Sequence, residues 1–209
     1  MKKLKVIIIG LGSRGTTYAK HGYDACPEFE LVGIADPDPV RRNYVKEKCQ
    51  LDDSACFESW EDILALPKFA DAAIIATQDQ MHFEPAMKAI ELGYHLLLEK
   101  PAAPTPEECY KIADAANKKG VHVVVCHVLR YTPFYTKLKE IIDSNIIGDI
   151  MTVNAEEGVG YWHQAHSFVR GNWRNDSQTS PMIMQKCCHD LDMLQHYANS
   201  KCESVYSVG

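Results

Sequence analysis

The sequence predicts an α/β fold in which a Rossmann-type, doubly wound parallel sheet is followed by an incomplete α+β unit. Two observations predict it. Short apolar runs alternate with helical patterns through the first 130 residues, which is the order of strands and crossover helices in a parallel sheet. After about residue 130 the pattern changes to helices and alternating polar and apolar segments. We therefore expect a first domain over residues 1–127 and a partial second domain over residues 128–209.

The expected strands of the first domain are short and in places apolar throughout, as strands buried on both faces of a sheet should be. Val6–Ile9 and Val123–Val125 are two such runs. A capping box with proline at the first helical position, Thr105 to Glu108, marks one helix start. We expect strands at 4–9, 30–35, 55–57, 71–76, 95–98 and 121–127, and helices at 14–24, 38–48, 59–65, 81–92 and 106–118.

The second half of the chain contains fewer elements. We expect a helix over 132–144, a strand with one solvated face over 150–156, and a site-lining loop without periodicity over 158–180. A helix over 181–198 and a strand over 203–208 follow. Because one helix pair and two strands cannot bury a sheet face of their own, we expect this domain to be incomplete.

Composition argues against several kinds of partner. The net charge is −6 and no basic run exceeds two residues, whereas nucleic-acid binding depends on clustered positive charge. No apolar stretch approaches the roughly 20 residues that span a bilayer, and the apolar run near the N-terminus is too short for a signal peptide. None of the eight cysteines forms a CxxC pair, so we expect reduced thiols and no metal site. A cytoplasmic protein without nucleic-acid or membrane partners is expected.

The string Gly10-Leu11-Gly12-Ser13-Arg14-Gly15 stands where an apolar strand passes into a helix. In this context Gly10 permits a tight turn, Gly12 lets backbone N–H groups approach a diphosphate, and Gly15 lets the helix pack closely on the strand. The helix start at Ser13 and Arg14 then presents N–H groups with partial positive charge. We expect these residues to bind a dinucleotide, with a plain turn as the alternative.

Asp36 ends the next apolar strand, 21 residues after Gly15. A carboxylate there accepts hydrogen bonds from the two adenosine ribose hydroxyls and repels a 2′-phosphate, so the sequence favours NAD. Arg41 and Arg42 follow one turn later and leave NADP open as a second cofactor. A role for Asp36 as a helix cap alone is the other interpretation.

Lys100 lies in Glu99-Lys100-Pro101, at the end of the fifth expected strand. Ligands of such folds bind at this carboxyl edge of the sheet. An ammonium close to an oxidised nicotinamide would meet like-charge repulsion and partial desolvation, both of which help it share a proton with a substrate hydroxyl. Lys100 is therefore the leading catalytic candidate, and a solvated lysine at a strand end is the alternative.

Together these strings resemble the Gfo/Idh/MocA family of oxidoreductases, named after glucose-fructose oxidoreductase, inositol dehydrogenase and a rhizopine-catabolism protein. The resemblance implies that Thr77 lies along the cofactor, that His82 starts a helix near the cofactor edge, and that Glu99 and Lys100 lie beside the nicotinamide, with Lys100 as the catalytic lysine. The matching strings are Val6 to Gly15 with Asp36, Ala76-Thr77 with His82, Gly93-Tyr94-His95, Glu99-Lys100-Pro101, Arg130-Tyr131 with Pro133, Ile147-Gly148, and His189 with Asp192.

Members of this family pair the lysine with a histidine in an Asp-xxx-His motif of the second domain. The corresponding stretch here starts at Gln185 and ends at His189, so the histidine matches and glutamine replaces the usual aspartate. On one continuous helix the two residues share a face, and Gln185 would orient a substrate hydroxyl without a negative charge. The resemblance thus implies that Lys100, Gln185 and His189 are catalytic and bind the substrate. A histidine in a helix core is the alternative for His189.

Aromatic and hydrogen-bonding side chains crowd the segment before that helix, and they suit a sugar or polyol ligand. We expect Trp173 and Arg174 to bind the substrate, with interface or core packing as an equal alternative. The full group is Tyr161, Trp162, His163, His166, Arg170, Trp173 and Arg174.

The resulting hypothesis is an NAD-dependent dehydrogenase of a sugar, a sugar derivative or a cyclitol. His189 takes the proton of a substrate hydroxyl while Lys100 hydrogen-bonds the same oxygen and the hydride moves to NAD. A redox-neutral, NAD-dependent glycosidase of the same fold and a nucleotide-sensing protein without turnover are the alternatives. Because members of the family continue well beyond this length, the resemblance also implies a C-terminally truncated chain whose full-length form is a homo-oligomer.

Overall fold

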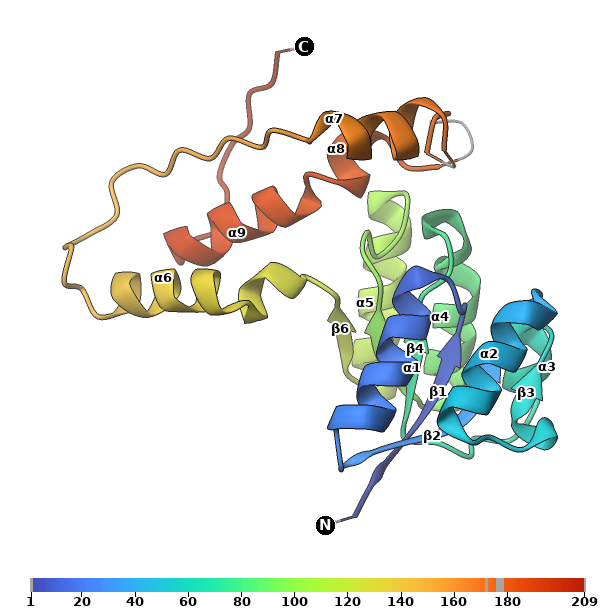
Figure 1. The fold of residues 1–209 in the computed structure, drawn as a ribbon. Coiled ribbons are helices and arrows are strands. Elements are labelled where there is room, and N and C mark those ends of the chain that lie inside the picture. Colours follow the sequence, from blue (N-terminus) through green and yellow to red (C-terminus); the bar gives the residue numbers. More distant parts are fainter. Residues whose placement is uncertain (1, 172, 176–178, 209) are drawn as a thin grey trace. The chain divides into compact units, whose positions relative to one another are not determined.

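The computed structural model describes residues 2–171, 173–175 and 179–208. The chain forms two compact units, residues 1–126 and residues 127–209. The first unit is an α/β domain built on one sheet, and the described part of the second unit consists of helices and extended segments (Figure 1).

The sheet has six parallel strands in the order β3-β2-β1-β4-β5-β6. The strands are β1 (Leu4–Ile9), β2 (Phe29–Ala35), β3 (Cys56–Phe57), β4 (Ala72–Ile75), β5 (His95–Leu98) and β6 (Val123–Val125). The order reverses between β1 and β4, and ligands of such sheets bind at the carboxyl ends of the strands beside that reversal. The predicted doubly wound fold and its six strands are confirmed.

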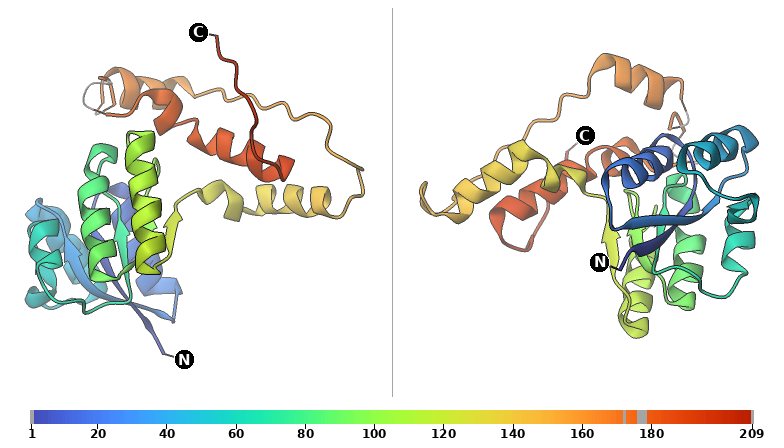
Figure 2. Two further views of the ribbon diagram at one scale, coloured as in Figure 1. Left: turned by 180° about the vertical axis from the view of Figure 1, so that it is seen from behind. Right: turned by 60° about the horizontal axis from the view of Figure 1, so that its bottom comes forward.

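Helices cover both faces of the sheet (Figure 1 and the left view of Figure 2). In β1, Ile7 and Ile9 join the core under α3, α4 and α5, whereas Val6 and Ile8 join the core under α1 and α2. A strand buried on both faces must be apolar throughout, which is why its sequence shows no alternation. The helices are α1 (Ser13–Ala25), α2 (Pro39–Cys49), α3 (Trp60–Leu64), α4 (Phe83–Leu92) and α5 (Pro106–Lys119), with short 3-10 helices η1 (Asp53–Ala55) and η2 (Asp79–Met81).

Local signals begin or end some of the helices, and the predicted capping residue Thr105 is one of them. At the start of α3, the Ser59 hydroxyl accepts the backbone N–H of Asp62 at 3.1 Å. At the start of α5, the Thr105 hydroxyl accepts the backbone N–H of Glu108 at 3.3 Å. Each bond satisfies an amide that the helix itself leaves without an acceptor. Gly120, with φ +72°, ends α5 in the left-handed conformation that glycine favours.

The second unit begins with a 3-10 helix and continues with short helices. The predicted helix over 132–144 is confirmed as α6. In the part of the chain that the structure describes, no helix is long and apolar enough to cross a membrane. The elements are η3 (Val128–Tyr131), α6 (Pro133–Asp143), α7 (Tyr161–His163), the π-helix η4 (Gln164–Val169), α8 (Met182–Gln185) and α9 (Cys188–Ala198).

The second unit differs from the prediction in four segments. Residues 150–156 and 203–208 are extended but not strands, because a strand needs a hydrogen-bonded neighbour and none lies among the described residues of this unit. The segment 158–180, expected to be a loop, contains α7 and η4. The helix expected over 181–198 is divided into α8 and α9 at Cys187, whose ψ of 1° departs from helical geometry and whose residue type is a poor helix former.

Candidate functional site

The last residues of all six strands of the first unit pair with one another across the sheet. In the order of the sheet they are Phe57, Ala35, Ile9, Ile75, Leu98 and Val125. The residue after each of them therefore lies at the carboxyl edge, where parallel sheets bind their ligands. These residues are Glu58, Asp36, Gly10, Ala76, Glu99 and Cys126.

The glycine string forms a close turn between β1 and α1. Gly10 has φ +87°, and a Cβ on it would lie 2.8 Å from the backbone of Ala76. A Cβ on Gly15 would lie only 1.9 Å from the carbonyl oxygen of Gly10. Helix α1 thus passes so close to the turn that a side chain fits at neither position.

The start of α1 has the features of a diphosphate site. A Cβ on Gly12 would meet nothing within 4 Å, and Gly12 is the N-cap, so no side chain caps the helix. Ser13 is exposed at the first helical position. The first N–H groups of a helix have no partner within it and carry partial positive charge. These residues therefore fit the diphosphate of a dinucleotide.

Asp36 ties the end of β2 to the glycine turn. It is 4% exposed, and its Oδ2 accepts the N–H of Leu11 at 2.6 Å while its Oδ1 accepts the N–H of Asp38 at 2.9 Å. Each oxygen keeps a second lone pair, which suits a further donor such as a ribose hydroxyl. One guanidinium nitrogen of Arg41 lies 4.0 Å from Oδ2.

His82 supports the loops after β4 and β5 from inside the protein. Its side chain is buried, with Nδ1 2.8 Å from the carbonyl oxygen of Pro101 and Nε2 3.2 Å from that of Thr77. The Thr77 hydroxyl in turn donates to the carbonyl of Met81 at 3.0 Å. Burial lowers the pKa of His82 although both carbonyls oppose the shift, so the neutral ring donates to one of them. His82, predicted near the cofactor edge, is thus placed behind that edge rather than on its surface.

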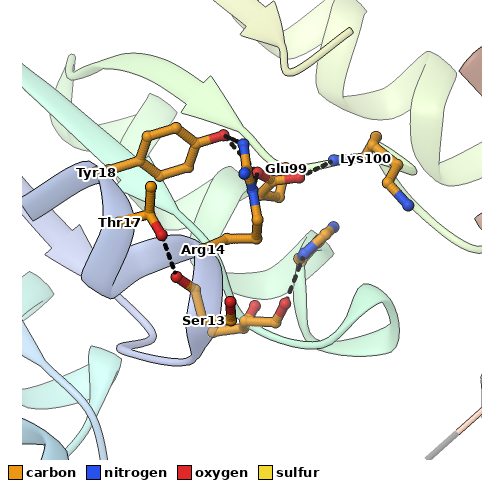
Figure 3. Close-up of polar contacts among 8 residues, drawn as sticks. Ser13, Arg14, Thr17, Tyr18, Glu99 and Lys100 are labelled. Atoms are coloured by element: carbon orange, nitrogen blue, oxygen red, sulfur yellow. Dashed lines mark hydrogen bonds and ion pairs between the residues drawn. The ribbon is translucent and has the colours of Figure 1, made fainter. Parts of the chain in front are cut away.

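Glu99 is the centre of a polar cluster (Figure 3). Its Oε1 accepts from Arg14 Nε at 2.9 Å and from the Tyr18 hydroxyl at 2.5 Å, and its Oε2 accepts from the backbone N–H of Lys100 at 3.1 Å. Arg14 also donates to the Tyr18 oxygen at 2.7 Å, and its guanidinium lies 4.9 Å from the centre of the Tyr18 ring. The side chain of Lys100 is directed away from the Glu99 carboxylate.

The charges of this cluster are fixed by its hydrogen bonds. Burial opposes ionisation of Glu99, but the bonds from Tyr18 and Arg14 hold the pKa of the carboxyl below its usual value. Burial, together with Cys126 and Glu99, raises the pKa of Tyr18, so the phenol stays protonated. Burial also raises the pKa of Cys126 to about 11. At neutral pH the cluster therefore contains one cation and one anion.

Sequence reasoning identified Arg14 and Glu99 separately but missed Tyr18 and Cys126. One signal was available, because Arg14 and Tyr18 are four residues apart and share a face of α1. Their meeting with Glu99, 85 residues from Arg14, depends on the pairing of distant strands. Nothing local in the sequence predicts it.

The second unit carries the remaining predicted site residues. Gln185 ends α8 and His189 lies in the first turn of α9, so the prediction that they share a face of one continuous helix is wrong. The break at Cys187 separates them into two elements. The His189 ring packs edge to face against the His127 ring, with 5.9 Å between the ring centres.

An ion pair fixes the helix that carries His189. Arg130 donates to both carboxylate oxygens of Asp192, at 2.7 Å and 2.6 Å, and His127 Nδ1 lies 3.9 Å from the same group. The bonds to Asp192 raise the pKa of Arg130. Asp192 is three residues after His189 and shares its side of α9. The ion pair between Arg130 and Asp192 therefore holds that side of α9 against η3.

Trp173 and Arg174 follow η4 in this unit. The backbone N–H of Trp173 donates to the carbonyl of Ser167 at 3.2 Å, and that of Arg174 donates to the carbonyl of Gly171 at 3.3 Å. Trp173 is half-buried and Arg174 is exposed.

The described residues contain no group of three or more side chains able to hold a metal ion.

Two family models match the chain. Residues 4–127 match the model described as "Oxidoreductase family, NAD-binding Rossmann fold", and residues 135–209 match the "GFO/IDH/MocA C-terminal domain". The predicted resemblance and the predicted NAD-binding Rossmann fold are confirmed.

Individual relatives are distant and longer. An inositol 2-dehydrogenase of Corynebacterium glutamicum is 25% identical over 98% of this chain and 57% of its own length. A 2,7-anhydro-N-acetylneuraminate hydratase of Escherichia coli is 26% identical over 71% of this chain and 39% of its own length. The solved scyllo-inositol dehydrogenase from Lactobacillus casei, with bound NAD(H) and scyllo-inositol, has the same fold, with a TM-score of 0.80 and 19% identity over 95% of this chain and 57% of that chain. The chain spans about half the length of the curated relatives it matches.

Proposed function

The chain belongs to the Gfo/Idh/MocA oxidoreductase family, and from this premise we propose that it transfers a hydride between NAD and a hydroxyl-bearing carbon of a sugar, a sugar derivative or a cyclitol. One observation carries the proposal. The strands β1, β2 and β5 end in register with one another across the sheet, and they are followed by the glycine turn, Asp36 and Glu99-Lys100. A diphosphate site, an acceptor for the ribose hydroxyls and a lysine therefore lie along one edge of the sheet.

The residues divide between holding the cofactor and acting on the substrate. The backbone from Gly10 to Gly15 would hold the diphosphate, and Asp36 would hold the adenosine ribose. Thr77 would lie along the cofactor, and Glu99 and Lys100 would lie beside the nicotinamide. When bound, NAD supplies the hydride acceptor of the reaction. Lys100 hydrogen-bonds the substrate hydroxyl and stabilises the charge that develops on its oxygen.

In the second unit, the roles of His189 and Gln185 rest on the family resemblance, and those of Trp173 and Arg174 rest on the chemistry of their side chains. His189 accepts the hydroxyl proton, since an imidazole suits reversible proton transfer near neutral pH. Gln185 orients a neighbouring hydroxyl as an amide donor or acceptor. Trp173 and Arg174 offer an aromatic face and paired N–H donors to a polyhydroxylated ligand.

The proposal is tested by NADH formation from a panel of polyols, sugars and glycosides, using the full protein. Lys100→Met and His189→Ala should each lower turnover by about 10²–10⁴-fold, the usual contribution of one proton-transfer group. NAD affinity should stay within a few-fold of wild type. Lys118→Met is the matched control, because Lys118 is exposed on α5 and its ion pair is with Asp114. Undiminished turnover in Lys100→Met with NAD bound would refute the assignment.

A redox-neutral reaction is the second candidate, and one observation favours it. The similar Escherichia coli protein is named a hydratase rather than a dehydrogenase. In an NAD-dependent glycosidase of this kind, transient oxidation of the substrate would acidify a neighbouring C–H, elimination would release the aglycone, water would add to the resulting double bond, and return of the hydride would restore the hydroxyl. Cleavage of an aryl glycoside without NADH accumulation would favour this reaction. Tight NAD binding without any turnover would instead indicate a nucleotide-sensing protein.

Cofactor choice and assembly complete the proposal. NAD is preferred over NADP because the Asp36 carboxylate repels a 2′-phosphate, although Arg41 beside it keeps NADP as the alternative. Calorimetric titration with both coenzymes distinguishes the two. We further propose a cytoplasmic homo-oligomer that binds a small sugar or polyol and no nucleic acid, with light scattering as the test of its assembly.

A further inference from the structure

We infer that Arg14, Tyr18 and Glu99 form a positioning cluster that fastens the backbone of Lys100 to the start of helix α1. The inference rests on the proposed function, because it takes Lys100 as the residue that acts on the substrate. It assigns a joint role to three side chains that touch one another in the first unit.

The first step of the argument is the burial of a charge. The Glu99 side chain is 8% exposed, and an ionised carboxylate in such a place needs charged or hydrogen-bonding partners. Arg14 supplies the opposite charge and Tyr18 a second donor, both to Oε1. That leaves Oε2 for the N–H of Lys100.

The second step is preorganisation. Arg14 and Tyr18 stand four residues apart on α1, and the guanidinium both lies over the phenol ring and donates to its oxygen. The Tyr18 hydroxyl accepts from Arg14 and donates to Glu99, so the three groups form a closed set of bonds. Because Arg14 belongs to the glycine string itself, the cluster links the diphosphate-binding turn to the end of β5.

The third step concerns the backbone around Lys100. Its N–H is held by Glu99, and the carbonyl of the next residue, Pro101, lies 2.8 Å from His82 Nδ1. The backbone is thus held on both sides of the Lys100 side chain, which fixes the direction in which that side chain leaves the edge. Figure 3 shows it leaving away from the Glu99 carboxylate, whose charge is already matched by Arg14.

Two variants of the full protein test the cluster. Tyr18→Phe removes one hydroxyl at nearly constant shape, and Arg14→Gln removes the charge. Tyr23→Phe is the matched control, since it removes an exposed hydroxyl from the same helix. The first readout is hydrogen exchange of the Lys100 backbone amide by NMR, which needs neither cofactor nor substrate. Each cluster variant should raise the exchange rate about tenfold, the effect of weakening one hydrogen bond to a charged group.

The second readout is the pH profile of turnover together with the affinity for NAD. In Arg14→Gln the Glu99 charge is left without its cation, so the Lys100 ammonium keeps its proton to higher pH, and the falling limb of the profile, where that proton is lost, should move to higher pH. The turnover number should fall about tenfold in both cluster variants, because their Lys100 is held less firmly. NAD affinity in Tyr18→Phe should stay within a few-fold of wild type.

Exchange and pH profiles identical to those of Tyr23→Phe in both variants would overturn the positioning role. The two proposals fail separately. A wild-type protein with a protected Lys100 amide that the variants lose, yet with no NADH formation, would refute the dehydrogenase and support the cluster. Normal turnover in the wild type, with a Lys100 amide whose exchange neither substitution changes, would support the dehydrogenase and refute the cluster.

Discussion

Two glycines of the same turn should respond to alanine in opposite ways. A Cβ on Gly15 would stand 1.9 Å from the carbonyl oxygen of Gly10, whereas a carbon and an oxygen in contact need roughly 3.3 Å. Helix α1 must therefore retreat from the turn, and overpacking of this kind costs about 1–3 kcal/mol of the free energy of unfolding. A Cβ on Gly12 meets nothing within 4 Å, and its backbone (φ −64°, ψ −166°) is open to alanine. Gly12→Ala should change stability by less than about 0.5 kcal/mol.

Binding should show the reverse order of effects. The methyl group of Gly12→Ala occupies the open space beside the first amides of α1, where the diphosphate is proposed to lie, so NAD affinity should fall at least about tenfold, or about 1.4 kcal/mol. Urea denaturation measures the first quantity and calorimetric titration with NAD the second. Wild-type NAD affinity in Gly12→Ala would refute the proposed phosphate position, and wild-type stability in Gly15→Ala would refute the close packing of α1.

Two further predictions concern polar groups in the two units. His82→Gln should flatten the pH dependence of the free energy of unfolding. Burial lowers the pKa of His82 in the folded state, so below about pH 6.5 the unfolded chain binds a proton that the folded chain does not. In the wild type this difference lowers the free energy of unfolding by up to about 1.4 kcal/mol for each pH unit of acidification. Urea denaturation at about pH 7.5 and about pH 5.5 measures the difference, and equal slopes in variant and wild type would contradict it. Asp192→Asn should lower the free energy of unfolding by about 1–2 kcal/mol, because it leaves Arg130 without its two-bond partner in a partly screened place. Denaturation curves that coincide with wild type would contradict this.

The sequence predicts the first unit well because its signals are local. A strand, a glycine turn and a helix such as 4–25 form one continuous segment, so apolar runs and capping residues place each element. The residues Gly10, Asp36 and Glu99 then meet through the parallel register alone, which the alternation of strands and helices already implies.

Other features depend on partners that local signals do not specify. The Tyr18 hydroxyl donates to Glu99, 81 residues later in the chain, and neither residue type predicts this hydrogen bond. In the second unit, 150–156 alternates like a strand, yet alternation shows only which side chains share a face and not whether a neighbouring strand exists. The break in the helix expected over 181–198 lies at Cys187, whose backbone is not helical. Cysteine has a weak helix preference, but the helical periodicity of the surrounding apolar residues outweighs that signal in the sequence.

The protonation states around Lys100 also determine how a pH profile should be read. Glu99 has a pKa below its usual value, burial keeps His82 neutral at pH 7, and Tyr18 has a raised pKa. The buried Cys126 thiol, with a pKa of about 11, likewise keeps its proton. Because none of these supporting groups changes charge between about pH 7 and pH 9, they hold the Lys100 backbone in the same way throughout that interval. A limb in the turnover profile within that interval therefore does not come from these four groups. If the limb disappears in Lys100→Met while residual activity persists, the group that titrates there is Lys100.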